Sequence, residues 1–365
     1  MIRVSEIELE YEKSLEEEVF WEGKVKELKE EFGNQLMILC HYYQRDSVFR
    51  LGDAVGDSLE LAKRGAANKT AKYLVFCGAH FMAETQDMLA SKDQIVMMPD
   101  LKAGCTLVNQ IKLKQLEDAW GILTQFRKEQ DIVPIAYVNS SADIKAFCGK
   151  HNGTICTSSS SNKIFQWAIN QNKMIVFFPD EHIGRNAANS IEIPRENVFV
   201  WKRNVSGGTL TEEQIKRAQL ILWSGSCRFH DKFTPELVKK LKKEHPDARV
   251  VVHSECCEET VAESDYYGST STILNCIADS EPESKWFIGT EYNMVERMKR
   301  ENEGLRDVNC LAKSICSFMY KADLKKLYNV LVSIKEGTPI NIVSVGDDVA
   351  IPARRALKKM LEITS

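Results

Sequence analysis

A pattern that occurs three times along the 365-residue chain constrains its fold more than any other feature. In each copy a short apolar run ends in two polar side chains two positions apart. A hydroxyl-rich segment then opens a helical pattern, and a cysteine in a polar or glycine-containing loop closes the copy. The copies are His41, Tyr43, Ser58 and Cys105; Tyr137, Asn139, Ser158 and Cys227; and His253, Glu255, Ser269, Thr270 and Cys316.

The spacing within these copies indicates internal repetition. The interval from serine to cysteine is 47 residues in the first and third copies and 69 in the second. Self-similarity of this kind is typical of diverged copies of one structural unit. We therefore expect three related α/β units, with the middle one enlarged.

The third copy illustrates the local structure that each is expected to form. Arg249–Val252 is a β-branched run typical of a strand buried on both faces. Residues two apart in an extended chain face the same side, so His253 and Glu255 should point together from the strand's carboxyl end. Gly268–Ser271 precedes an apolar helical pattern, and such a helix start offers backbone N–H groups to an anion. Ser58 and Ser158 suggest equivalent anion sites in the other copies.

Strands that alternate with helices at this length predict parallel βαβ units, with ligands at the carboxyl ends of the strands. The fold class is therefore α/β, with three analogous three-layer αβα domains whose parallel sheets surround a pseudo-threefold axis. The predicted boundaries are 1–118, including an N-terminal helix, 119–227 for the enlarged unit, and 228–316. Residues 317–365 are predicted to form C-terminal helices that pack back on the first domain.

Composition limits the classes of function. A chain of this length with 44% hydrophobic residues can bury the cores of two or three domains. Its net charge of −4 is spread over interleaved acidic and basic residues, which favours neither nucleic acid nor an anionic membrane as a partner. No run approaches the roughly 18 apolar residues of a membrane span, and the start lacks a signal-peptide pattern. We expect a cytoplasmic protein.

Two groups stand out among the 11 cysteines. Their dispersed spacing and the missing export signal argue against a disulfide framework. Cys40, Cys77, Cys148 and Cys276 lie within or beside apolar segments and are interpreted as small buried hydrophobes. Cys105, Cys227 and Cys316 occupy loops and are the candidate metal ligands. Cys310 is placed in the loop of Cys316 as an ordinary cysteine, with a regulatory disulfide as the alternative.

Three thiolates that converge on one point restrict which metal cofactor the site could hold. A closed zinc site takes four ligands, and a catalytic zinc usually adds histidine or carboxylate. An iron–sulfur cluster normally takes four cysteines, so a 4Fe-4S cluster held by three leaves one iron open. An open iron is a Lewis acid suited to loss of water from an organic substrate. The surrounding polar pairs could move protons, and three anion sites would suit substrates with three carboxylate or phosphate groups.

Several segments together resemble the quinolinate synthase family, and the likeness extends from about Leu36 to Ile363. They are His41–Gln44, Val55–Ser58, Phe76–Thr85, Pro99–Cys105, Tyr137–Ala142, Gly268–Ser271 and Ile288–Glu291. The resemblance implies condensation of dihydroxyacetone phosphate with iminoaspartate, with loss of water and phosphate, to give quinolinate in de novo NAD biosynthesis. It also implies one 4Fe-4S cluster on Cys105, Cys227 and Cys316. A functional link to an iminoaspartate-producing enzyme, L-aspartate oxidase or aspartate dehydrogenase, follows.

The same resemblance implies roles for individual residues. Glu255, Tyr43 and His253 would be catalytic, with Glu255 and Tyr43 as the acid–base residues. Substrate contacts would come from His41, Ser58, Tyr137, Asn139, Ser158, His253, Glu255, Ser269 and Thr270. Serines fill positions 158–161, so the contacting serine of that copy is open by a residue or two. The chain departs from the family pattern at Ser254 and Ser317, where the family has proline.

Two alternatives to a synthase remain at this level. One is an iron–sulfur redox sensor without catalysis, which the lack of a DNA-binding element disfavours. The other is an inactive homologue of the same fold.

Overall fold

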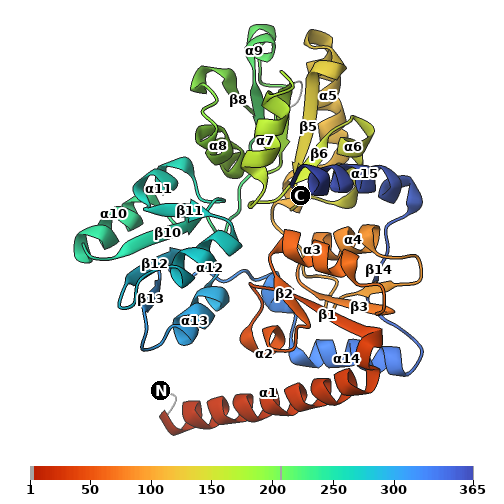
Figure 1. Cartoon of the computed structure of the whole chain (residues 1–365), viewed down its shortest axis with the longest axis vertical. Coiled ribbons are helices and arrows are strands. Elements are labelled where there is room, and N and C mark those ends of the chain that lie inside the picture. Colours follow the sequence, from red (N-terminus) through yellow and green to blue (C-terminus); the bar gives the residue numbers. More distant parts are fainter. Residues whose placement is uncertain (1–3, 206–207, 365) are drawn as a thin grey trace. The chain divides into compact units, whose positions relative to one another are not determined.

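Three sheets flanked by helices make up the protein (Figure 1). A computed structural model describes residues 4–205 and 208–364, with side chains described from residue 16 onward. The chain divides into two compact units, which are described separately below. Residues 1–104 and 317–344 form the first unit, and residues 105–316 and 345–365 form the second.

The first unit contains one five-stranded sheet in the order β14-β4-β3-β1-β2. Its strands are β1 (Leu36–His41), β2 (Ala54–Gly56), β3 (Tyr73–Cys77), β4 (Ile95–Met97) and the antiparallel edge strand β14 (Ile342–Val343). Its helices are α1 (Val4–Phe32), α2 (Asp46–Phe49), α3 (Ser58–Ala67), α4 (His80–Leu89) and α14 (Leu324–Lys335). Val25 and Leu28 of α1 and Leu327 and Leu331 of α14 are buried in one core with β1, so the N-terminal helix is part of this unit's packing.

The second unit holds the other two sheets. The sheet in the order β6-β5-β7-β9-β8 consists of β5 (Ile132–Tyr137), β6 (Thr154–Cys156), β7 (Met174–Phe178), β8 (Val198–Trp201) and β9 (Leu220–Trp223). Its helices are α5 (Leu113–Phe126), α6 (Ala142–Lys150), α7 (Ser161–Ile169), α8 (Glu181–Ser190), α9 (Glu212–Arg217) and α15 (Asp347–Thr364).

The remaining sheet is four-stranded, in the order β11-β10-β12-β13. It comprises β10 (Arg249–His253), β11 (Tyr266–Gly268), β12 (Lys285–Gly289) and β13 (Asp307–Cys310), with helices α10 (Pro235–Glu244), α11 (Glu258–Glu263), α12 (Thr270–Ala278) and α13 (Tyr292–Glu301). Short 3-10 helices lie at Gly33–Gln35, Val108–Gln110, Glu129–Asp131, Arg195–Asn197 and Met319–Lys321.

The three sheets repeat one topology. In each, the first strand lies between the second and the third, and a fourth follows the third: β2-β1-β3-β4, β6-β5-β7-β9 and β11-β10-β12-β13. The pairing at the carboxyl end of the first strand also repeats, as His41↔Gly56, Tyr137↔Cys156 and His253↔Gly268. The additional edge strand β8 and helix α9 lie within the longer serine-to-cysteine interval. The expected α/β class and the three αβα units are confirmed, while their arrangement around a common axis stays a prediction.

Two expectations about domain limits are wrong. Helix α5 packs against α6 and α9 of the second sheet, so that domain begins before residue 119. Helix α14 packs on the first unit as expected, but α15 packs along α6 in the second unit (Figure 1). A Cβ on Gly149 of α6 would lie 1.8 Å from the carbonyl oxygen of Pro352, because the two helix backbones touch there.

Within residues 4–205 and 208–364, no helix is both long and apolar enough to cross a bilayer.

Candidate functional site

The polar pair after β10 is held in a tight turn at the end of the strand. The imidazole Nδ1 of His253 accepts a hydrogen bond from the backbone N–H of Glu255, at 3.2 Å. The first unit has the same turn after β1, where Nδ1 of His41 accepts from the N–H of Tyr43 at 3.2 Å. A ring nitrogen that accepts a hydrogen bond carries no proton, so the proton of each neutral ring lies on Nε2.

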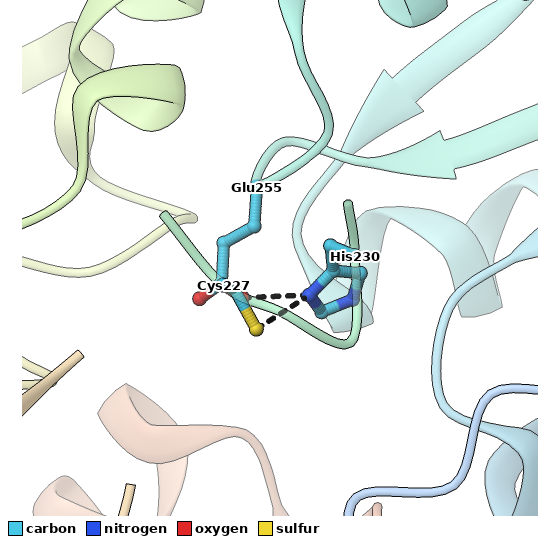
Figure 2. A group of neighbouring side chains, drawn as sticks. All are labelled: Cys227, His230 and Glu255. Atoms are coloured by element: carbon cyan, nitrogen blue, oxygen red, sulfur yellow. Dashed lines mark hydrogen bonds and ion pairs between the residues drawn. The ribbon is translucent and has the colours of Figure 1, made fainter. Parts of the chain in front are cut away.

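The Glu255 carboxylate is the centre of the buried polar network. The Tyr137 hydroxyl donates to its Oε1 at 2.7 Å, and Asn139 Nδ2 donates to the same atom at 3.4 Å. Its Oε2 lies 2.7 Å from Nδ1 of His230. Figure 2 marks this contact with a dashed line. The structure therefore brings together the predicted residues Tyr137, Asn139 and Glu255, from two different sheets of the second unit.

Opposing effects set the ionisation of Glu255. Burial alone would raise the pKa of a carboxyl that is only 4% exposed. The charge and hydrogen bond of His230, with His253 and Tyr137, outweigh burial and hold the pKa of Glu255 well below its usual range. Glu255 is therefore an ionised, buried acceptor at neutral pH.

His230 is a site residue that the sequence interpretation missed. Its Nδ1 faces Cys227 Sγ at 3.3 Å as well as Glu255, and its Nε2 lies 3.2 Å from Thr290 Oγ1. The ring stacks on that of His253, with centroids 4.5 Å apart and planes 20° apart. The signal was present, because a histidine three residues after a candidate ligand cysteine has the spacing of a metal-binding pair.

The loop that carries Cys227 is clamped to the segment that carries Cys105. The side-chain amide of Gln110, five positions after Cys105, donates to the carbonyl of Ser226 at 2.7 Å and accepts from its N–H at 3.0 Å. Gly225 allows this approach, since a Cβ there would lie 3.0 Å from Gln110 Oε1 and 2.2 Å from the carbonyl oxygen of Pro179. The two loops are thus fixed to each other through backbone groups.

The three predicted ligand cysteines act on one another electrostatically. Burial, with the charges of Glu255 and Cys316, raises the pKa of Cys105 to about 12. Burial, Glu255 and Cys105 likewise raise the pKa of Cys227 well above its ordinary value. Such thiols ionise readily only beside a cation. The donor set therefore fits a cationic metal centre, including an iron–sulfur cluster.

Neighbouring groups orient two of these cysteines. Asn139 Nδ2 lies 4.0 Å from Cys105 Sγ, and the N–H of Cys316 donates to Glu291 Oε1 at 3.3 Å. Glu291 also caps helix α13, so its carboxylate ties the Cys316 loop to the end of β12. Glu291 is thus a second residue of this region whose role the sequence did not indicate, although it lies in a motif that carried the resemblance.

The hydroxyl-rich segments of the second and third sheets share a pocket of about 270 Å³. Ser158, Ser159 and Ser161 line it from one sheet, and Ser254 and Ser269 line it from the other. Ser269 is the N-cap of α12 and accepts from the N–H of Thr272, as the sequence predicted. Thr270, the first residue of α12, is buried and is not among the lining residues.

Two of the expected helix-start sites differ in detail. Ser158 lies in a turn before α7, whose N-cap is Ser160, two positions later and within the residue or two that the sequence left open. Ser58 is the first residue of α3, but the Asp57 carboxylate already accepts from the N–H groups of Leu59 and Glu60. The Asp57 carboxylate thus already satisfies two of the N–H groups at that helix terminus.

Cys310 ends strand β13 and does not lie in a loop, which corrects the sequence interpretation. It is a free thiol that donates to Glu296 Oε1 at 3.7 Å. Burial and Glu296 raise the pKa of Cys310 to about 12, which disfavours the thiolate that disulfide exchange requires.

Comparison with known proteins gives consistent results. The model of the family described as quinolinate synthetase A protein matches residues 23–362. Curated quinolinate synthases from Bacillus cereus strains ATCC 14579 and B4264 are each 43% identical to the chain over 343 residues, covering 93% of it and 92% of the relative. A quinolinate synthase from Bacillus anthracis strain CDC 684 is 42% identical with the same coverage.

Proposed function

The chain belongs to the quinolinate synthetase A family, and on that premise we propose that it is a quinolinate synthase of NAD biosynthesis. The proposed reaction condenses dihydroxyacetone phosphate with iminoaspartate and releases water and phosphate to give quinolinate. The buried, ionised Glu255 carboxylate beside Cys227 and Cys105 is the observation that carries this assignment.

We propose that Cys105, Cys227 and Cys316 hold one 4Fe-4S cluster. Two observations support this proposal. Cys316 contributes to the raised pKa of Cys105, and Cys105 contributes to that of Cys227. The Gln110 side chain also ties the segment that follows Cys105 to the loop that carries Cys227. When bound, a cluster with one open iron supplies a Lewis acid for the dehydration steps.

We propose that the chain's own residues bind the substrates and transfer protons. Glu255 is proposed as an acid–base residue because of the family resemblance, and the Tyr137 hydroxyl at 2.7 Å holds its carboxylate in place. His253, whose proton lies on Nε2, can donate it to a substrate oxygen. Further substrate contacts are proposed for His41, Ser58, Asn139, Ser158, Ser269 and Thr270, with Tyr43 as a second acid–base residue.

The proposed reaction also requires a source of iminoaspartate. An enzyme that forms iminoaspartate, either L-aspartate oxidase or aspartate dehydrogenase, must supply the second substrate. We therefore propose a functional link to one of these activities.

The test is anaerobic turnover with both substrates. The wild-type protein should form quinolinate, and Glu255→Gln should lower kcat by roughly 10²- to 10⁴-fold, because it removes the proton acceptor while keeping the shape of the side chain. Glu259→Gln on the exposed side of α11 is the control and should retain turnover.

Two outcomes would contradict the proposal. A cluster-loaded protein that makes no quinolinate would point to a redox sensor or an inactive homologue. Unaltered turnover in Glu255→Gln would remove this carboxylate from the mechanism.

A further inference from the structure

We propose that the cluster-free protein binds a divalent transition-metal ion, such as Zn²⁺, at Cys227, His230 and Glu255. Each residue offers one ligand atom, and these atoms all lie within 4.8 Å of one another (Figure 2). The set shares only Cys227 with the proposed cluster ligands. The same region of the protein would therefore bind either the cluster or the single ion, with Cys227 as the shared ligand.

The geometry is close to what a tetrahedral ion requires. With metal–nitrogen and metal–oxygen bonds of about 2.0 Å and a metal–sulfur bond of about 2.3 Å, neighbouring ligand atoms lie about 3.3–3.6 Å apart. His230 Nδ1 is 2.7 Å from Glu255 Oε2 and 3.3 Å from Cys227 Sγ. His230 Nδ1 would thus need to move only about 0.6 Å from Glu255 Oε2 and about 0.2–0.3 Å from Cys227 Sγ. The third pair, Cys227 and Glu255, has its ligand atoms within 4.8 Å of each other.

The donor types and their burial favour a dication. A thiolate, a carboxylate and an imidazole are the ligand classes of catalytic zinc sites, with the fourth position left to water. Cys227, His230 and Glu255 are 7%, 3% and 4% exposed. An ion of charge +2 between one thiolate and one carboxylate gives a neutral buried group, which relieves the repulsion between the two anions.

Neighbouring residues hold the ligands in a metal-ready orientation. Thr290 Oγ1 lies 3.2 Å from His230 Nε2 and can accept a hydrogen bond from the Nε2–H group once Nδ1 binds the ion. This hydrogen bond fixes the tautomer that metal binding requires. Tyr137 donates to the other oxygen of Glu255, which leaves Oε2 to coordinate. Ordering of ligands by such partners typically strengthens metal affinity by 10- to 100-fold.

One consequence rests on the proposed role of Cys227 as a cluster ligand. If both centres use that sulfur, they cannot be occupied together, so a bound divalent ion blocks cluster assembly. Cluster-free protein is then held in a metal-loaded form until the ion leaves.

The experiment uses the full-length, cluster-free protein and Co²⁺ as a spectroscopic probe for Zn²⁺. Titration should give one equivalent of bound Co²⁺, with a thiolate-to-cobalt charge-transfer band and visible bands of tetrahedral intensity. His230→Ala and Glu255→Gln should each weaken binding by roughly tenfold or more. Cys105→Ser and Cys316→Ser are the matched controls and should leave the spectrum and affinity unchanged.

The results separate this site from the cluster site. If Cys105→Ser or Cys316→Ser abolishes the charge-transfer band, or if His230→Ala leaves it intact, the proposed ligand set is wrong. Circular dichroism of each variant establishes that it is folded. A failure to form quinolinate would contradict the proposed function without altering the Co²⁺ titration.

A second measurement tests the exclusion. Preloading the wild-type protein with one equivalent of Zn²⁺ should slow cluster reconstitution with iron and sulfide, and His230→Ala should remove the delay. Reconstitution at the same rate with and without Zn²⁺ would overturn the exclusion.

Discussion

We expect Thr290 to affect the proposed reaction through its contact with His230. Its hydroxyl lies 3.2 Å from His230 Nε2, while His230 Nδ1 is bonded to Glu255. Thr290→Val removes the hydroxyl and keeps the shape, so His230 Nε2 loses its hydrogen bond to this oxygen at a cost of about 1–2 kcal/mol. We expect kcat to fall roughly 5- to 30-fold with an unchanged cluster spectrum.

Thr290→Ser provides the control for this positioning role. It restores the hydroxyl without the methyl group and should recover most of the turnover. A loss in Thr290→Ser as large as that in Thr290→Val would assign the effect to packing, and the positioning role would be rejected.

His182 should make stability depend on pH. Burial alone would lower its pKa, but the hydrogen bond and charge of Asp231, with Asp180 and Glu181, raise it above the ordinary value. The folded state therefore binds the proton more tightly. This stabilisation is full below about pH 6.5, the pKa of an unfolded histidine, and is lost as the pH rises through the raised folded value. Partial exposure of the pair limits it to about 1 kcal/mol.

The measurement is the free energy of urea unfolding for wild type and His182→Gln at about pH 6 and about pH 8.5. The free energy of unfolding of the wild type should exceed that of His182→Gln by more at the lower pH. Asp231→Asn should show the same loss, and adding His182→Gln to it should change the pH dependence no further. An advantage that grows with pH would contradict the assigned sign.

At the scale of residues, the sequence predicted which side chains lie at the ends of strands. It did not predict which of them form hydrogen bonds with residues far away in the chain. The alternation of an extended chain is enough to pair His253 with Glu255. The bonds from Glu255 to Tyr137 and His230 span 118 and 25 positions of the chain, and no local pattern encodes them. The spacing of His230 from Cys227 is a signal of a metal-binding pair, but His230 does not belong to a polar pair that follows a strand.

At the scale of elements, the contact between α6 and α15 offers a sharp test of packing. Gly149→Ala in α6 would bring a methyl group to 1.8 Å from the Pro352 carbonyl oxygen, and backbone cannot move away cheaply. We expect destabilisation by about 1–3 kcal/mol, as for other overpacked sites. Denaturant unfolding followed by circular dichroism measures the change.

Gly121→Ala is the matched control, because Gly121 lies in the exposed face of α5 with nothing within 4 Å of its Cβ position. It should stabilise by up to about 1 kcal/mol, since alanine favours a helix over glycine. Equal effects of the two substitutions would mean that α15 does not pack on α6.

Long apolar strands were predictable, while short edge elements were not. The β-branched run Arg249–Val252 was predicted to be a strand, and β10 extends only one residue beyond it, to His253. The second strands β2, β6 and β11 have three residues each, too few to show a period, and were not predicted. The destination of α15 was also missed, because an amphipathic pattern shows that one face is buried but not which surface covers it.

At the scale of the whole molecule, the spacing of the repeats carried most of the information. Equal intervals of 47 residues predicted two units of the same length, and the interval of 69 predicted an enlargement. The structure accounts for the enlargement with β8 and α9. Spacing cannot reveal how contacts divide the chain, and the division into two compact units after Gly104 was not foreseen.

This division allows cluster binding and turnover to be separated by mutation. The proposed ligands Cys105, Cys227 and Cys316 belong to the second unit, while Tyr43 belongs to the first. Each Cys→Ser change at the three ligands should abolish the 4Fe-4S absorbance, whereas Cys276→Ser on α12 should preserve it. Iron and sulfide analysis of anaerobically purified protein measures both.

Tyr43→Phe should have the opposite profile. It removes a proposed acid–base hydroxyl and leaves every proposed ligand in place, so iron content should stay at the wild-type value while kcat falls roughly 10²-fold or more. The neighbouring Tyr42→Phe is the control, and it should keep both, because Tyr42 packs on Phe49. Loss of iron in Tyr43→Phe would assign this residue to cluster retention, and unchanged kcat would exclude its hydroxyl from the chemistry.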